Sequence, residues 1–113
     1  MDGVELIAAE RQRQVTSEGW TPEHDDGHST GDLLLAAESY LHSMEAVPFG
    51  VENGVPDGKR LEPRLRPPHQ WPWDASWWKP SDDQVRNLVK AGALIAAEID
   101  RLKRLESAAI ASE

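Results

Sequence analysis

The 113-residue sequence contains no cysteine, which excludes disulfides, thiolate metal sites and cysteine nucleophiles. It has no excess of basic residues either. The formal net charge is −8 at pH 7, so we expect no positively charged surface for nucleic-acid phosphates or for an anionic membrane. No apolar run approaches the length of a membrane span, and the N-terminus does not read as a signal peptide. We therefore expect a single domain located in the cytoplasm.

Phenylalanine and tyrosine are nearly absent, with one of each, whereas tryptophan occurs five times. Four of the five tryptophans lie in the segment 71–80, which reads WPWDASWWKP. Proline inside a Trp-Pro-Trp step is incompatible with a helix interior, so we predict an extended segment or a chain of turns. Because indole is the largest apolar side chain, this segment is expected to form the centre of a small core or the wall of a pocket.

A first amphipathic helix is predicted from Asp2 to Glu18. Asp2 and Glu5 have the spacing of a capping box, and Gly19 supplies the end of the helix. The face expected to be buried carries Val4, Ile7, Ala8, Arg11 and Val15. The face expected to meet solvent carries Glu10, Gln12, Arg13 and Glu18.

A second helix is predicted after residue 30, capped by Ser29 or Thr30 and ending near residues 44–47, before Pro48. Its expected buried stripe consists of Leu33, Ala37, Tyr40, Leu41 and Met44.

The last helix has the strongest periodicity in the chain. Ser81 and Gln84 suggest a second capping box, and apolar residues then recur at spacings of three and four for more than five turns. The stripe consists of Val85, Leu88, Val89, Gly92, Ile95, Ile99, Leu102 and Leu105. Because this stripe is longer than one companion helix can cover, we expect a homodimer that buries the remainder. Residues 107–113 are expected to fray.

Two segments between the helices are expected to be irregular. Glycine and proline interrupt residues 19–28, and residues 48–70 lack apolar periodicity, so the latter are interpreted as a long loop. A small hairpin within 48–70 is the open alternative. The predicted fold class is therefore mainly α: a three-helix domain packed around the tryptophan-rich segment.

The acidic loop contains the candidate metal ligands His24 and His28. Imidazoles four residues apart share a face only on a helix, and Gly27 and Pro22 disfavour one, so we expect no metal and no other cofactor. Arg11 falls on the apolar stripe and therefore needs a partner. We expect Asp25, Asp26 or Asp32 to supply it in a structural salt bridge. The alternative is that Arg11 points at a ligand phosphate.

A ligand pocket is predicted between the 19–28 loop and the tryptophan segment, with Gly92 as its floor. Indoles stack on planar bases, carboxylates bind ribose hydroxyls, and cationic groups bind phosphate. The residues expected to bind the ligand are Arg11, Trp20, Thr21, His24, Asp25, Asp26, His28, Tyr40, Trp71, Trp73, Trp77, Trp78 and Lys79. Glu98 and Arg101 are expected to form only a surface pair.

Three stretches resemble a family of small proteins carried by bacteriophages and prophages. They read EGWTPEHDD at 18–26, WPW with WWKP at 71–80, and LVKAGALIAAEIDRL at 88–102. The helix followed by Gly19-Trp20-Thr21 and an acidic loop is also similar to the repeat domain of ryanodine receptors and its bacterial relatives. The second resemblance implies a helical domain, some of whose members bind adenine nucleotides.

Because phage proteins of this size often counter host defence, the phage resemblance implies such a role. Our first hypothesis is a non-enzymatic protein that sequesters a cyclic-nucleotide or ADP-ribose immune signal in the host cytoplasm. The second is an acidic inhibitor of a host defence protein, similar to an anti-CRISPR. The third is a metal-dependent, all-helical nucleotide pyrophosphohydrolase, which would need paired Glu-x-x-Glu and Glu-x-x-Asp helices that the chain lacks. The plain alternative is a small helical protein whose tryptophans only fill the core.

Overall fold

The computed structural model describes residues 1–28, 31–52 and 55–112. It is mainly helical with one two-stranded sheet, so the predicted fold class is confirmed. In chain order the elements are α1 (Gly3–Ser17), α2 (Pro22–Asp26), α3 (Asp32–Leu41), β1 (Met44–Glu52), β2 (Val55–Pro63), the 3-10 turn η1 (Ala75–Trp77) and α4 (Gln84–Ala111).

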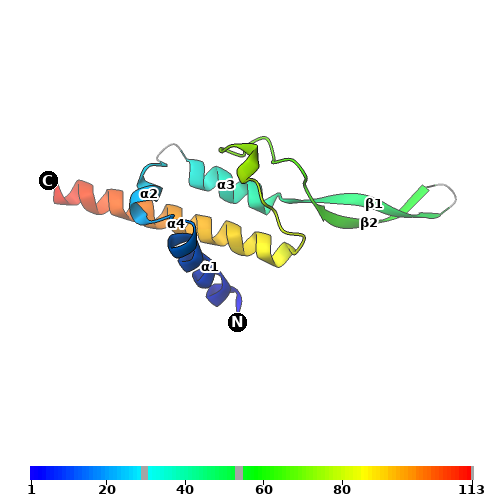
Figure 1. The fold of residues 1–113 in the computed structure, drawn as a ribbon, viewed down its shortest axis with the longest axis horizontal. Helices are drawn as coiled ribbons and strands as arrows, with labels where there is room; N and C mark the ends of the chain where they lie inside the picture. Colours follow the sequence, from blue (N-terminus) through cyan, green and yellow to red (C-terminus); the bar gives the residue numbers. More distant parts are fainter. Residues whose placement is uncertain (29–30, 53–54, 113) are drawn as a thin grey trace.

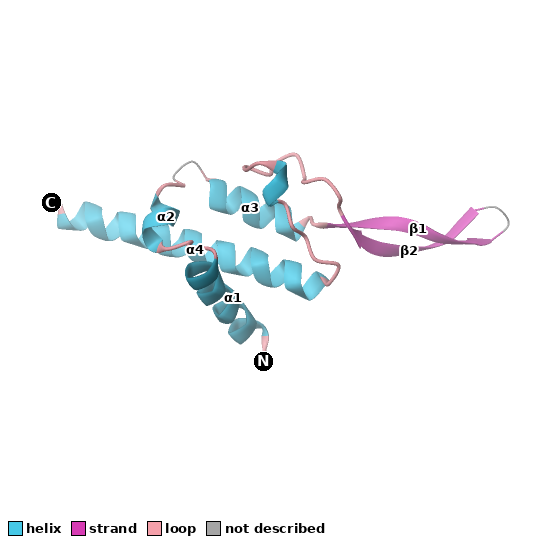
Figure 2. Ribbon diagram, in the orientation of Figure 1, coloured by secondary structure: helices cyan, strands magenta, loops and turns pink. Residues whose placement is uncertain are grey.

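Helix α4 is the element to which the other helices attach. It contacts α1, α2 and α3, and α3 runs antiparallel beside it (Figure 1). The antiparallel hairpin β1–β2 leaves the end of α3 and projects away from the helices (Figure 2). The molecule is therefore elongated, with extents of 70 × 32 × 23 Å.

The core lies where α3, α4 and the tryptophan segment meet. Small residues on the facing sides of α3 and α4 allow close approach of the two helices, and Trp78 and Tyr40 close one end with stacked rings 5.0 Å apart. The indole N–H of Trp78 donates to the Arg64 carbonyl at 3.1 Å. The buried apolar cluster comprises Leu33, Ala36, Ala37, Tyr40, Trp78, Ala91, Leu94 and Ala97.

The first helix begins and ends where predicted, but its buried face is not the predicted one. Asp2 and Glu5 form both bonds of the capping box. Val4, expected inside, is 78 % exposed, and Ala8 is exposed as well. Glu10, expected in solvent, is buried because Arg13 and Arg86 both bind its carboxylate, and Gln14 is buried beside it. Ion pairing thus allows a charged residue to occupy the packed face.

The segment 19–28 is not an irregular loop throughout. Pro22 occupies the first position of α2, where its missing N–H costs nothing, and the Thr21 hydroxyl accepts the His24 N–H at 3.3 Å. Proline here starts a helix instead of preventing one. The helical turn of α2 brings His24 and His28 near each other.

Residues 48–70 are not a long irregular loop either, because most of them belong to the β1–β2 hairpin. Its register pairs Met44 with Pro63 and Glu52 with Val55. The second helix accordingly ends at Leu41, earlier than predicted, and Leu41 is exposed. The predicted caps Ser29 and Thr30 lie outside the described residues, and the residue at the N-cap position is Gly31.

The last helix begins at Gln84, one residue after its cap. Asp83, not Ser81, accepts the Val85 N–H at 3.0 Å, so the predicted capping box does not form. The helix continues to Ala111 and so includes most of the tail that was expected to fray. Residue 113 lies outside the described part.

Most of the predicted stripe of α4 lies in solvent, not in the core. Val89 is buried, whereas the other six branched side chains of the stripe are about half exposed. The face that packs on α3 carries alanines and Leu94 instead. The exposed members are Val85, Leu88, Ile95, Ile99, Leu102 and Leu105. Glu98 and Arg101, predicted as a surface pair, are buried and bound to each other.

Candidate functional site

Aromatic rings form a continuous chain from the core to the surface. Trp78 contacts Trp71 with ring centroids 5.0 Å apart, and Trp71 contacts Trp73 at 5.3 Å. Trp73 then meets Trp20 at 5.9 Å and His28 at 5.5 Å. The inner members fill the core, and the outer members reach the surface beside α2.

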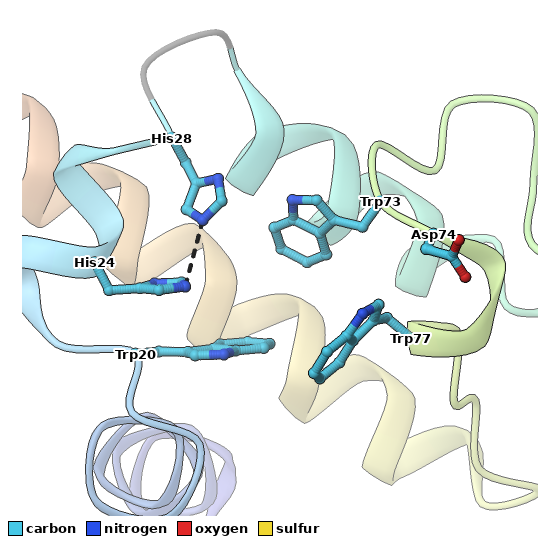
Figure 3. Close-up of a pocket in the computed structure, with 6 residues that line it drawn as sticks. All are labelled: Trp20, His24, His28, Trp73, Asp74 and Trp77. Atoms are coloured by element: carbon cyan, nitrogen blue, oxygen red, sulfur yellow. Dashed lines mark hydrogen bonds between the residues drawn. The ribbon is translucent and has the colours of Figure 1, made fainter.

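A cavity of about 280 Å³ lies at the outer end of this chain, between α2 and the tryptophan segment (Figure 3). Trp20 and His24 lie parallel to each other, at an interplanar angle of 2°. Trp77 is 59 % exposed and contributes a third indole to the wall. The cavity is lined by Trp20, His24, His28, Trp73, Asp74 and Trp77.

Hydrogen bonds fix the two histidines in position. Their Nε2 atoms are 3.4 Å apart. On the far side of each ring, His24 Nδ1 is 3.3 Å from Asp25 Oδ1, and His28 Nδ1 is 3.1 Å from Asp32 Oδ2. Each imidazole thus has a carboxylate behind it and the other imidazole in front of it.

A second, smaller pocket of about 80 Å³ shares Trp20 and Trp77 with the first. Lysine side chains line it: Lys79 is exposed, and Lys90 donates to the Lys79 carbonyl at 2.8 Å. Burial, followed by the nearby charge of Arg86, lowers the pKa of Lys90. Glu10, Arg13 and Glu18 also line this pocket and are paired with one another, so Lys79 and Lys90 are the further cationic groups beside the aromatic cavity.

The predicted site residues separate into four groups. Five of them line the aromatic cavity, namely Trp20, His24, His28, Trp73 and Trp77. Four hold α2 in place and do not line this cavity, namely Arg11, Thr21, Asp25 and Asp26. Trp71 and Trp78 belong to the packed aromatic chain, and Tyr40 and Lys79 line the second pocket.

Arg11 makes the structural salt bridge expected for it. Its Nη2 bonds to Asp25, whose side chain is fully buried, and its Nη1 donates to the Trp20 carbonyl at 3.2 Å. The neighbouring acid Asp26 bonds to Arg104 on α4 at 2.8 Å. These ion pairs fasten the C-terminal end of α2 to α1 and to α4.

Gly92 does not floor the cavity. A Cβ atom at this position would lie 2.7 Å from Ile7 Cδ1 and 2.9 Å from Ile7 Cγ1. The glycine is therefore needed where α1 crosses α4, and substituting it with leucine would displace α1 instead of filling a pocket.

Sequence reasoning missed Asp74 and Lys90. Asp74 Oδ1 accepts the Ser76 N–H at 2.8 Å, which caps η1, and an Asp two residues before a Ser is a recognisable cap pattern. Lys90 is not part of the predicted apolar stripe, and its ammonium lies 5.4 Å from the centre of the Tyr40 ring only because of how the helices pack.

The chain matches no family model, no curated protein and no solved structure. Within the described residues, no helix is both long enough and apolar enough to cross a membrane. The same part of the chain contains no group of three or more His, Cys, Asp and Glu residues that could hold a metal ion.

Proposed function

We propose that the protein binds a nucleotide-derived small molecule of the cyclic-nucleotide or ADP-ribose type and sequesters it without turnover, as a phage-encoded counter-defence protein. The observation that carries the proposal is the cavity beside α2, with three indoles in its wall. Planar bases stack on indole faces, and each such contact contributes about 1–3 kcal/mol. A volume of about 280 Å³ is near the lower end of the range for small-molecule pockets.

The two lysines of the adjoining pocket support a ligand that carries phosphate. Trp20 and Trp77 line both pockets, so a ligand with its base in the first can extend its phosphate into the second. Lys79 is exposed there, and it makes no ion pair with any residue in the described ranges. We therefore assign phosphate recognition to Lys79 and leave Arg11 with its structural role.

Sequestration fits this lining better than catalysis does. The cavity wall consists mainly of apolar rings, and its carboxylate, Asp74, is engaged with the backbone of η1. Rings held against one another are rigid, so little side-chain freedom is lost when a planar ligand enters.

Calorimetric titration of the full chain with cyclic dinucleotides, cyclic ADP-ribose isomers and ADP-ribose tests the proposal. EDTA in the buffer keeps metal ions out of the measurement. We expect at least one member of the panel to bind with a dissociation constant well below 1 mM and to change tryptophan fluorescence. Binding weaker than ~1 mM, or about −4 kcal/mol, for every member would contradict the proposal. The acidic-inhibitor hypothesis would then be favoured.

Two variants with matched controls localise the ligand. Trp77→Ala should weaken binding about tenfold or more, because it removes a stacking wall that is largely exposed and contributes little to the core. Leu65→Ala, at a position 95 % exposed, is its control. Lys79→Gln should weaken the binding of phosphate-bearing ligands, whereas Lys103→Gln near the C-terminus should leave their binding unchanged.

We further propose that two copies associate through the exposed stripe of α4, in keeping with the expected homodimer. Four of its branched residues, Ile95, Ile99, Leu102 and Leu105, lie beyond the point where α1 crosses α4 at Gly92. Their spacing of four, three and three keeps them on one side of the helix. In a symmetric dimer, the same stripe on α4 of a second copy would pack against it.

A further inference from the structure

The two histidines beside the cavity have an arrangement that the proposed function does not use. Helix α2 brings His24 to the cavity, and the His28 N–H donates to the Asp25 carbonyl at 2.9 Å, which continues the helical turn. As a result the two Nε2 atoms lie 3.4 Å apart (Figure 3). The pair is half-exposed and opens onto the cavity.

The partners behind the rings determine which nitrogen carries hydrogen. Asp25 is buried and bound by the Arg11 guanidinium, so its carboxylate acts as an acceptor toward His24 Nδ1. Asp32 Oδ2 lies 3.1 Å from His28 Nδ1. A neutral imidazole has one N–H, and placing it on the carboxylate side of both rings leaves each Nε2 with a lone pair.

A cation beside two such nitrogens, 3.4 Å apart, would stabilise both lone pairs. A shared proton would satisfy the pair, and so would a metal ion. On a tetrahedral Zn²⁺ ion with bonds of ~2.0–2.1 Å, two imidazole nitrogens lie about 3.3–3.4 Å apart, which matches the separation observed here. The carboxylate behind each ring is the usual outer partner of a metal-bound histidine, because it fixes the tautomer and the ring orientation.

We propose that His24 and His28 bind a divalent transition-metal ion such as Zn²⁺ through their Nε2 atoms. Imidazole nitrogen suits zinc, copper and nickel, and three carboxylates at 25, 26 and 32 make the surroundings acidic. The described residues supply two ligands and no third, so the remaining positions open toward the cavity and take water or a donor atom of a small molecule. The expectation that the segment holds no metal assumed that it is not helical, and α2 removes that assumption.

Isothermal titration of the full chain with zinc chloride in a non-coordinating buffer tests the site. We expect one ion per chain with a dissociation constant below about 100 μM, and a binding-dependent rise in melting temperature. His28→Gln should weaken zinc binding at least tenfold. His69→Gln, the same change at an exposed histidine elsewhere, should leave it unchanged. Melting of each variant without metal shows whether its fold is intact.

Electron paramagnetic resonance of the copper(II)-loaded chain supplies a second measurement. The spectrum should show splitting from two imidazole nitrogens in the wild type and from one in His28→Gln. Three results would overturn the proposal: no saturable zinc binding up to about 1 mM, equal affinity in His28→Gln, or an equal loss in His69→Gln. The zinc titration contains no organic ligand and the nucleotide titration contains EDTA, so either proposal can fail without the other.

Discussion

Glu10 shows how much one buried carboxylate can determine in a chain of this size. It is 3 % exposed and accepts hydrogen bonds from Arg13 on its own helix and from Arg86 on α4. Burial alone would raise the pKa of Glu10, but these bonds and the two positive charges outweigh it and hold the pKa below its ordinary value of 4.5. The ionised form therefore ties α1 to α4.

At the residue scale we predict that Glu10→Gln lowers the free energy of unfolding at pH 7 by about 1–3 kcal/mol, because hydrogen bonds to a charged group are lost. A depressed pKa stabilises the fold above the unfolded value and loses its effect as pH falls through the folded value. The difference between variant and wild type should thus be complete above about pH 5 and shrink below pH 4.5. Urea unfolding at several pH values measures it.

Glu106→Gln is the matched control, since Glu106 pairs with Lys103 on the exposed end of α4. An exposed pair contributes about 0–1 kcal/mol, so this variant should stay close to wild type at every pH. If the loss caused by Glu10→Gln were constant down to pH 3, ionisation of Glu10 would not be the source of the stability.

Single residues also explain which parts of the site could be predicted. The ion pair of Arg11 follows from its place on an apolar stripe, and the tryptophans are identified by composition alone. The facing histidines could not be predicted, because their approach depends on Pro22 starting a helix. Sequence alone does not distinguish a proline at a first helical position from one that ends a segment.

At the scale of elements, helix existence was predictable and helix orientation was not. Capping and periodicity locate α1 and α4 to within a few residues, apart from the extension of α4 to Ala111. Periodicity cannot tell which of two faces packs inward when one carries alanines and the other carries branched residues. The alanine face packs inward because Ala91 and Ala97 allow α3 to approach α4 closely. The hairpin was only the alternative to a long loop, because proline and glycine break the alternation expected of strands.

The hairpin leads to a prediction about stability at this scale. Two strands without a covering layer are marginal in water, and β1–β2 projects away from the helices (Figure 1). Replacing residues 47–60 with Asn-Gly would join the paired residues Ala46 and Leu61 through a two-residue turn. We expect the shortened chain to retain the near-ultraviolet circular dichroism of its tryptophans and to melt within a few degrees of the wild type.

A core variant shows that the assay for the shortened chain is sensitive enough. Trp78→Leu should flatten the same spectrum, because Trp78 stacks on Tyr40 inside the core. Loss of the tryptophan spectrum in the shortened chain would mean that the hairpin stabilises the helical body.

For the molecule as a whole, the elongated shape exposes apolar surface that a compact chain would bury. The half-exposed residues of α4 follow one side of a 28-residue helix. Separately scattered apolar residues are ordinary on a surface, but a continuous stripe usually marks an interface. The net charge of −8 opposes association at low salt, so any dimer should strengthen as salt screens that repulsion.

We therefore predict that the wild type has twice the mass of one chain in light scattering at tens of micromolar, and that Ile99→Glu has the mass of one chain. Ile99 is 54 % exposed in the single chain, so the substitution should cost little stability by itself. In a symmetric dimer it would place like charges in the interface from both copies, which is strongly unfavourable. Leu65→Glu, away from α4, introduces the same charge and should remain dimeric. A single-chain mass for the wild type at that concentration would rule out the α4 interface, whereas a dimer that survives Ile99→Glu would move the interface to another surface.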